Sequence, residues 1–154
     1  MMQHNTLSYS DGEDTSIPDE LISESPAGYE KSKDFTTLIA WQNARELKLF
    51  LYNQIIPKLP ECEKFNLSTQ ITRAAISITA NISEGYGRFH YKESVQFYRI
   101  SRGSLYELKD HLISCHDLKY IQAPQAQEGF RLIEKSKMSL NGYINYVKSK
   151  IGKP

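Results

Sequence analysis

The chain has 154 residues, of which 40% are hydrophobic and 24% charged, so it can bury one hydrophobic core. No stretch approaches the roughly 20 apolar residues of a membrane-spanning helix, and the N-terminus has neither the basic start nor the apolar run of a signal peptide. Cys62 and Cys115 stand far apart without metal-binding spacing, so we expect reduced thiols and a cytoplasmic protein.

The formal net charge of +1 hides an uneven distribution of charge along the chain. Residues 1–33 carry seven acidic and two basic residues, a net charge of −5, and show no hydrophobic periodicity. Because such a composition buries too little apolar surface to offset the entropy of ordering, we expect an acidic disordered tail. The tail could bind a partner, compete for the basic part of the chain, or have no role of its own.

Residues 34–154 form the predicted folded domain, with 17 basic and 11 acidic residues and a net charge of +6. This excess fits binding to a polyanion, and it is also common on ordinary protein surfaces. The first helix should begin near Asp34, a candidate N-cap, and end near Ile56 because Pro57 follows. Its inward face is predicted from helical spacing to contain Leu38, Trp41, Ala44, Leu47 or Lys48, Leu51 and Ile55.

The second predicted helix contains the most informative stretch of the chain, LSTQITRAAISITANISEGYGR at residues 67–88. Its apolar residues fall on one side of a helix, and the small residues around them let other helices approach closely. We expect this helix to run from about residue 61 to residue 84, with Gly85 and Gly87 supplying a left-handed cap. A helix this apolar should be packed on several sides, at the centre of an all-helical fold.

Two further helices are predicted, from about residue 91 to 119 and from about residue 124 to 150. Their inward faces should contain Phe97, Ile100, Ser104, Leu108, Leu112 and Cys115 in the third, and Phe130, Ile133, Leu140, Ile144 and Val147 in the fourth. Four long helices with short links place sequence neighbours antiparallel. The predicted fold is therefore all-α, an antiparallel up-down-up-down four-helix bundle.

Arg73 and Glu107 are candidates for a structural polar pair. In a helical hairpin centred near residue 89, Arg73 would lie opposite Ser104 and within a turn of Glu107. The two side chains could then form a partly buried, charge-assisted hydrogen bond that fixes the register of the bundle. The alternative is that Arg73 contacts a ligand.

Basic residues around the link between the second and third helices are the better ligand candidates. Arg88 and Lys92 flank the link, Arg99 and Arg102 share one face of the third helix, and Lys109 is a lesser contributor. Aromatic residues lie among them, at Tyr86, Phe89, Tyr91 and Tyr98. Phosphate contact combined with base stacking needs this mixture of side chains. A solvated helix face or a tyrosine-rich subunit interface would look similar.

Catalytic and metal-binding patterns are missing from the sequence. A carboxylate-bridged di-metal bundle needs Glu-x-x-His pairs, whereas Glu107 and His111 are four residues apart. The histidines show no zinc spacing, and there is no phosphate-binding loop or GxSxG motif. We therefore expect no enzymatic activity, no metal and no cofactor.

The run QITRAAISITANISEG at residues 70–85, followed by Gly87-Arg88, closely resembles a bacterial family of four-helix bundles. Members of that family are encoded in intervening sequences of 23S ribosomal RNA genes and are often labelled S23-like ribosomal proteins. Trp41-Gln42-x-Ala44 and Arg102-Gly103-Ser104-Leu105-x-Glu107 also match. The resemblance covers about residues 35–122 well. Accessory variability proteins of diversity-generating retroelements are more distantly similar.

The resemblance implies a bundle that assembles into a ring-like homopentamer and binds nucleic acid, RNA in preference to DNA, through a basic surface. In the retroelement relatives the pentamer engages a reverse transcriptase and its RNA, so a protein-interaction scaffold is the alternative function. The matched polar residues could instead serve bundle register or subunit contacts; they are Gln70, Arg73, Asn81, Glu84 and Glu107. Nothing in the family matches residues 1–33, and an acidic tail folded over the basic face would weaken nucleic-acid binding.

Overall fold

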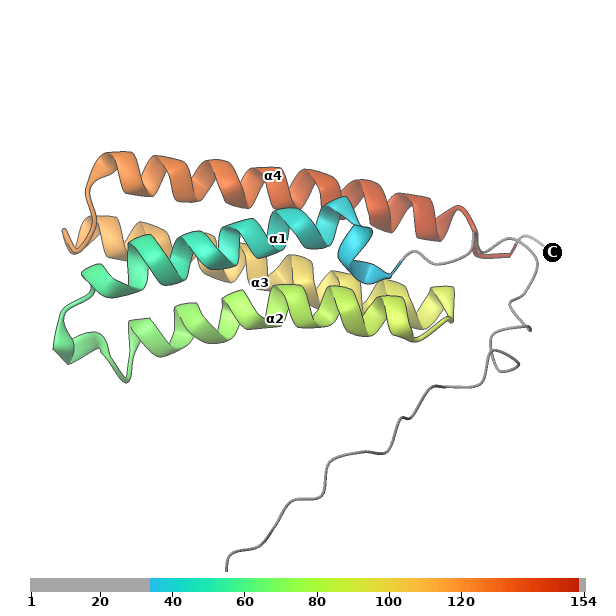
Figure 1. Ribbon diagram of the computed structural model, residues 1–154, viewed down its shortest axis with the longest axis horizontal. Coiled ribbons are helices and arrows are strands. Elements are labelled where there is room, and N and C mark those ends of the chain that lie inside the picture. Colours follow the sequence, from blue (N-terminus) through green and yellow to red (C-terminus); the bar gives the residue numbers. More distant parts are fainter. Residues whose placement is uncertain (1–33, 153–154) are drawn as a thin grey trace, which may run out of the picture. The chain divides into compact units, whose positions relative to one another are not determined.

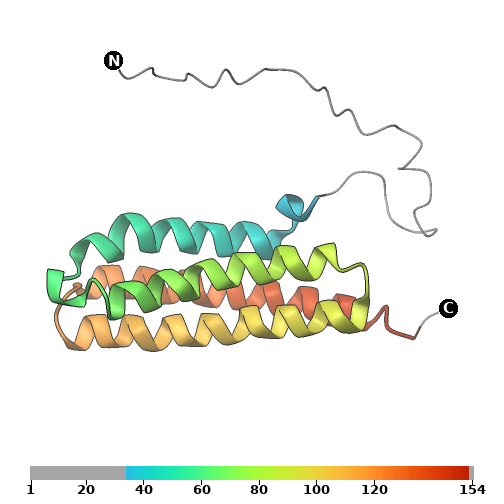
Figure 2. The same ribbon diagram turned by 90° about the horizontal axis from the view of Figure 1, so that it is seen from below.

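In the computed structural model, the described residues, 34–152, fold into four long α-helices (Figure 1). The predicted acidic tail, residues 1–33, lies outside the described residues. The helices are α1 (Ile39–Phe50), α2 (Leu67–Gly87), α3 (Tyr91–Asp117) and α4 (Ala123–Lys148). Each helix packs against two others, α1 and α3 each lying beside both α2 and α4 (Figure 2). The predicted all-α four-helix bundle is confirmed.

The first helix begins later than predicted and changes its hydrogen bonding before it ends. Asp34 caps a separate 3-10 turn, Phe35–Thr37, because its carboxylate accepts a hydrogen bond from the backbone N–H of Phe35 at 2.8 Å. After α1 the chain continues through a π-helical segment, Leu51–Ile55, directly ahead of Pro57, which has no N–H to extend an α-helix. Trp41 is only partly buried, and its ring meets that of Phe35 edge-on at 5.3 Å.

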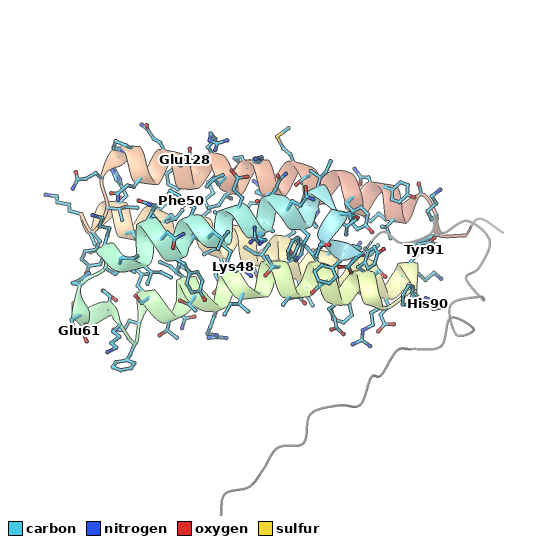
Figure 3. All side chains as sticks on the ribbon, viewed as in Figure 1. Lys48, Phe50, Glu61, His90, Tyr91 and Glu128 are labelled. Carbon is cyan, nitrogen blue, oxygen red and sulfur yellow. The ribbon has the colours of Figure 1, made fainter. Side chains whose placement is uncertain are left out.

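The second helix begins six residues after its predicted start. Residues Glu61–Glu63 form a separate 3-10 turn, and α2 starts at Leu67. The carboxylate of Glu63 accepts a hydrogen bond from the backbone N–H of Leu67 at 3.3 Å, so this acidic residue satisfies a donor at the true helix start. Glu61 and His90 mark opposite ends of the bundle in Figure 3.

The predicted glycine cap of the second helix is wrong. Gly85 and Gly87 both lie inside α2, and the left-handed residue of the following link is Phe89, with a φ of 51°. A Cβ at Gly85 would lie 2.5 Å from Cε1 of Tyr98 and 3.1 Å from Cβ of Phe97. Gly85 is therefore required by the close approach of α3, whose Tyr98 side chain is fully buried against it.

The hydrophobic core extends between all four helices. The predicted inward residues of α4 from Ile133 onward are buried, as are those of the first helix from Ala44 onward. In α3 the prediction is correct from Ser104 onward and wrong before it, because Tyr98 and Ser101 are buried while Ile100 is 52% exposed. One residue corresponds to a rotation of about 100°, so the real inward face is turned by that amount at the start of α3.

Two serines of α3 fix its register against α2. Ser101 donates a hydrogen bond from Oγ to the carbonyl oxygen of Ile78 at 2.9 Å, and Ser104 donates to Oγ of Ser77, also at 2.9 Å. These pairs place the helices antiparallel, within a few residues of the predicted hairpin register. Within residues 34–152, no helix is both long and apolar enough to cross a membrane.

Candidate nucleic-acid interface

Arg88, the first predicted contact, lies at the C-terminal end of α2 between two carboxylates. Its guanidinium forms ion pairs with Glu84 and, at 3.2 Å, with Glu93. The guanidinium carbon also lies 4.9 Å from the centre of the Phe97 ring. Two acidic groups already compensate the charge of Arg88. It should therefore bind a phosphate more weakly than its position in the sequence indicates.

Lys109 is likewise compensated by an acidic residue. Its ammonium lies 3.4 Å from Glu134 of α4, and the same carboxylate pairs with Lys137 at 3.1 Å. Hydrogen bonds from Lys137 and Lys109 lower the pKa of Glu134. The carboxylate thus stays ionised at neutral pH, and these three side chains form a small network along the α3–α4 boundary.

Lys92, Arg99 and Arg102 differ from the other two predicted contacts. Nη1 of Arg102 donates a hydrogen bond to the side-chain oxygen of Asn141 at 3.2 Å, a neutral partner that orients the guanidinium without compensating its charge. Lys92 and Arg99 are exposed and seven residues apart, which places them on one side of α3. Within residues 34–152, none of the three lies within 4.0 Å of a carboxylate oxygen.

The second half of α4 extends this surface. Asn141 lies beside Arg102, and Lys148 follows seven residues later on the same side of α4. Residues 135–152 contain no acidic residue, and the only acidic residue in the first half of α3 is Glu93, which is paired with Arg88. We name this surface the α3–α4 basic face, formed by Lys92, Arg99, Arg102, Asn141 and Lys148.

The aromatic residues predicted among these cations are divided between core and surface. Tyr98 is 1% exposed and belongs to the core, whereas Phe89 is 75% and Tyr91 37% exposed. α4 adds Tyr146, which is 56% exposed and lies 5.1 Å from the ammonium of Lys150. Asn141, Lys148 and Tyr146 were not among the contacts predicted from the sequence. The lack of acidic residues after Glu134 nevertheless indicates a basic surface on this part of α4.

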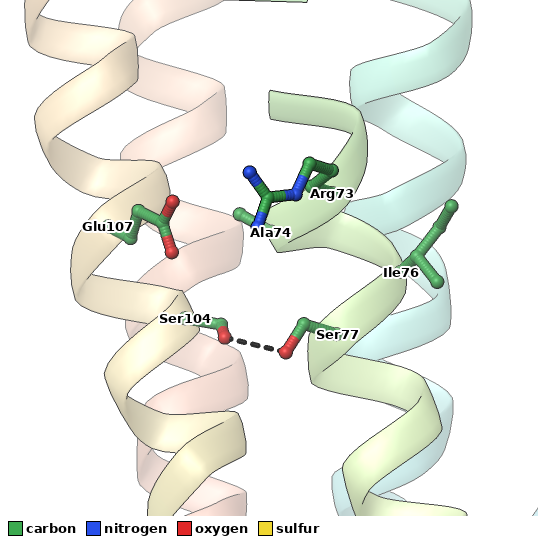
Figure 4. Close-up of a pocket in the computed structure, with 6 residues that line it drawn as sticks. All are labelled: Arg73, Ala74, Ile76, Ser77, Ser104 and Glu107. Carbon is green, nitrogen blue, oxygen red and sulfur yellow. Dashed lines mark hydrogen bonds between the residues drawn. The ribbon is translucent and has the colours of Figure 1, made fainter. Parts of the chain in front are cut away.

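Arg73 and Glu107 lie on opposite walls of an open groove of about 330 Å³ between α2 and α3, and their side chains point toward one another (Figure 4). In place of the predicted bond to Glu107, Arg73 donates a hydrogen bond to Gln70 at 3.3 Å. Glu107 lies 3.5 Å from Nε2 of His111. The hydrogen bond between Ser104 and Ser77 also lies in this groove, and it fixes the register that we had assigned to the charged pair.

Metal-ligating side chains do not gather in the part of the chain that the structure describes. No three His, Cys, Asp or Glu residues among 34–152 lie close enough together to hold a metal ion. Cys62 is exposed and Cys115 is buried, and both are free thiols.

These observations define a small all-α protein, an antiparallel four-helix bundle with a basic face. The profile of the 23S rRNA-intervening sequence protein family matches residues 36–142, more than half of the chain. The chain therefore belongs to the 23S rRNA-intervening sequence protein family, as the run at residues 70–85 indicated. The family by itself does not identify a ligand.

A solved structure supports the same fold. A protein of unknown function from the S23 ribosomal protein family of Bacteroides thetaiotaomicron, determined at 1.70 Å resolution, superposes with a TM-score of 0.63. The two sequences are 21% identical, and the match covers 69% of this chain and 98% of the other. At this identity the likeness shows the fold alone. No curated protein sequence matches this chain.

Proposed function

We propose that this protein is a non-enzymatic, oligomeric nucleic-acid-binding protein of the cytoplasm that binds RNA in preference to DNA. The α3–α4 basic face supports this function best. Lys92, Arg99 and Arg102 present three positive charges that no carboxylate of the described residues compensates, and Lys148 adds a fourth from α4. Arg88 and Lys109, which are paired with acidic side chains, contribute less to binding.

The geometry of Arg102 suits contact with a phosphate. Arg102 is held by Asn141, so its remaining donors have a fixed direction from which to bind a phosphate oxygen. Binding releases counterions from the nucleic acid, and three such contacts give a slope of about −2 to −3 in a plot of log affinity against log salt concentration. The net charge of +6 on residues 34–154 favours encounter with any polyanion.

We propose further that the bundle assembles into a homopentamer. Large apolar side chains stay exposed on the single chain, among them Ile100, Tyr106 and Met138, which are 52%, 55% and 74% exposed. Covering such residues favours self-association. The molar mass in solution, measured by light scattering during size-exclusion chromatography, tests this part of the proposal.

The same exposed apolar residues support the second candidate function, a protein-interaction scaffold or accessory subunit, for example of a reverse transcriptase. Ile76, which is 48% exposed, lies beside the groove that contains Arg73 and Glu107. Binding to a protein partner through this groove would depend on apolar contacts and would survive moderate salt.

Charge removal on the α3–α4 basic face should weaken RNA binding strongly. We expect the Arg99→Gln/Arg102→Gln variant to lose about 10- to 100-fold in affinity at low salt, since two phosphate contacts are removed. The measurement is fluorescence anisotropy with labelled structured RNA and with duplex DNA, for the full chain over a series of salt concentrations.

The matched control is Lys64→Gln/Arg131→Gln, which removes the same net charge from residues already paired with Glu61 and Glu128. Loss of these exposed ion pairs costs little stability, so the control should bind RNA nearly as the parent does. Equal weakening in both variants would mean that binding depends on net charge alone, and the α3–α4 basic face would be rejected as the binding site. If the parent does not bind RNA at low salt, the proposed function is wrong, and the protein-interaction scaffold is the remaining candidate.

A further inference from the structure

A second group of cations and aromatic residues lies on the opposite side of the bundle, along α1. Trp41, Arg45 and Lys48 lie in α1 and Tyr52 in the π-helical segment that follows, at spacings of four, three and four residues that keep them along one side. We name this surface the α1–α2 face. Because α1 and α2 are neighbours, as are α3 and α4, this face and the α3–α4 basic face lie on opposite sides of the bundle (Figures 1 and 2).

Lys48 is the most informative residue of the α1–α2 face. Its ammonium points from α1 toward α2 and donates a hydrogen bond to Oγ1 of Thr79 at 3.1 Å (Figure 3). Thr79 is 5% exposed, and its hydroxyl in turn donates to the carbonyl oxygen of Ile76 at 3.2 Å. The lysine is thus held in one direction by a neutral group, with two N–H donors remaining for another acceptor.

The charge of Lys48 is not compensated within the part of the chain that the structure describes. The only acidic residue of α1 is Glu46, which is paired with Lys135 of α4 at 2.6 Å, and α2 has no acidic residue before Glu84. Of the other partly buried lysines, Lys109 and Lys137 are paired with Glu134, and Lys150 lies over the Tyr146 ring. Lys48 therefore holds an uncompensated positive charge in a fixed direction beside α2, which suits an anionic ligand.

The neighbours of Lys48 indicate which anion fits. Arg45 supplies a second exposed cation one turn away, again without a carboxylate partner among residues 34–152. Tyr52 is 41% exposed, and Trp41 is partly exposed, with its ring at 74° to that of Phe35. Cations spaced along a helix together with partly exposed aromatic rings suit a strand whose phosphates and unpaired bases are both available.

We infer that the α1–α2 face binds a single-stranded segment of RNA, with Arg45 and Lys48 on phosphates and Trp41 and Tyr52 against bases. The inference rests on the proposed RNA-binding function. It adds a second RNA-binding surface, which differs from the α3–α4 basic face because it contacts bases as well as phosphates. A duplex hides its bases in the stack, so it can use the α3–α4 basic face but gains little from the aromatic residues of the α1–α2 face.

Trp41 provides a direct test because it is the only tryptophan in the chain. The full chain is titrated with a single-stranded oligouridylate and, separately, with duplex RNA of the same length, while tryptophan emission is recorded. Only the single strand should quench Trp41. Arg45→Gln/Lys48→Gln should abolish the quenching, lower affinity for the single strand about tenfold, and reduce the salt slope by about 1.4, since each lost contact contributes about 0.7.

Two further variants separate this inference from the proposed function. Arg99→Gln/Arg102→Gln should lower affinity but keep the quenching at saturation, and Lys64→Gln/Arg131→Gln should change neither. If RNA binding requires Arg99 and Arg102, yet Trp41 emission is constant and Arg45→Gln/Lys48→Gln binds as the parent does, the inference is wrong and the proposed function stands. A synthetic peptide of residues 1–33 that alters Trp41 emission where RNA does not would assign the face to an acidic segment instead.

Discussion

Replacing Gly85 with alanine should make the bundle about 1–3 kcal/mol less stable than replacing Gly87 with alanine. Gly85 lies inside α2 and Gly87 is its last residue, and neither has a positive φ, so alanine gains a helix propensity of up to about 1 kcal/mol at Gly85 and less at Gly87. They differ in their surroundings. A Cβ at Gly85 meets the Tyr98 ring at 2.5 Å, whereas a Cβ at Gly87 has nothing within 4 Å.

The cost at Gly85 comes from a ring that has little room to move. Tyr98 is 1% exposed, and its ring lies 5.2 Å from that of Tyr143 in α4, so a shift of Tyr98 disturbs α4 as well. Urea unfolding followed by circular dichroism gives the free energy of unfolding for both variants. Equal stability of the two would mean that α2 and α3 separate without cost, and that Gly85 has no packing role.

Gly85 also shows what hydrophobic periodicity could and could not predict. The number, order and antiparallel arrangement of the helices follow from apolar spacing and short links, and all were predicted correctly. A glycine near the end of an apolar run predicts a cap, because the pattern carries no information on what packs against it. The close approach of Tyr98 involves another helix, and for the same reason Tyr98 was misassigned to the surface and Ile100 to the core.

The candidate interface was predictable to a similar extent. Arg88 lies four residues after Glu84, a spacing at which ion pairs form within a helix. The ion pair that compensates the charge of Arg88 could therefore be predicted from the sequence. The pairing of Lys109 with Glu134 was not readable, because it depends on the register of α3 against α4. Lys48 occupied an ambiguous position at the edge of the inward face, and only the packing of α1 on α2 reveals its partner.

The two cysteines should differ in reactivity toward a thiol reagent by at least about 100-fold at about pH 8. Burial raises the pKa of the Cys115 thiol from 9.0 to about 11, and the charge of Glu63 adds to the increase. Two pKa units correspond to about 100-fold less thiolate, and Cys115 is 0% exposed, which slows the reaction further. Cys62 is exposed and should react at once. Stoichiometric labelling of one thiol per folded chain, followed by slow labelling of the second, is the expected result.

The raised pKa of Cys115 also predicts how stability depends on pH. Because the folded protein holds the proton more tightly than the unfolded chain, the stabilisation is fully present below about pH 9 and is lost as the pH rises toward 11. The loss should approach about 2–3 kcal/mol, the value of two pKa units. The hydrogen bond from Tyr120 to Glu63 raises the pKa of Tyr120 as well, so it acts in the same direction.

Urea unfolding across this pH range, for the parent and for Cys115→Ala, separates the two contributions. The alanine variant should be less stable at neutral pH because a buried side chain is truncated, yet its stability should fall less steeply above about pH 9. The pH dependence of stability that remains in the variant comes from Tyr120 and the other groups that titrate at alkaline pH. If parent and variant lose stability in parallel, Cys115 ionises as easily in the folded bundle as in the unfolded chain, and the slow second labelling reflects access alone.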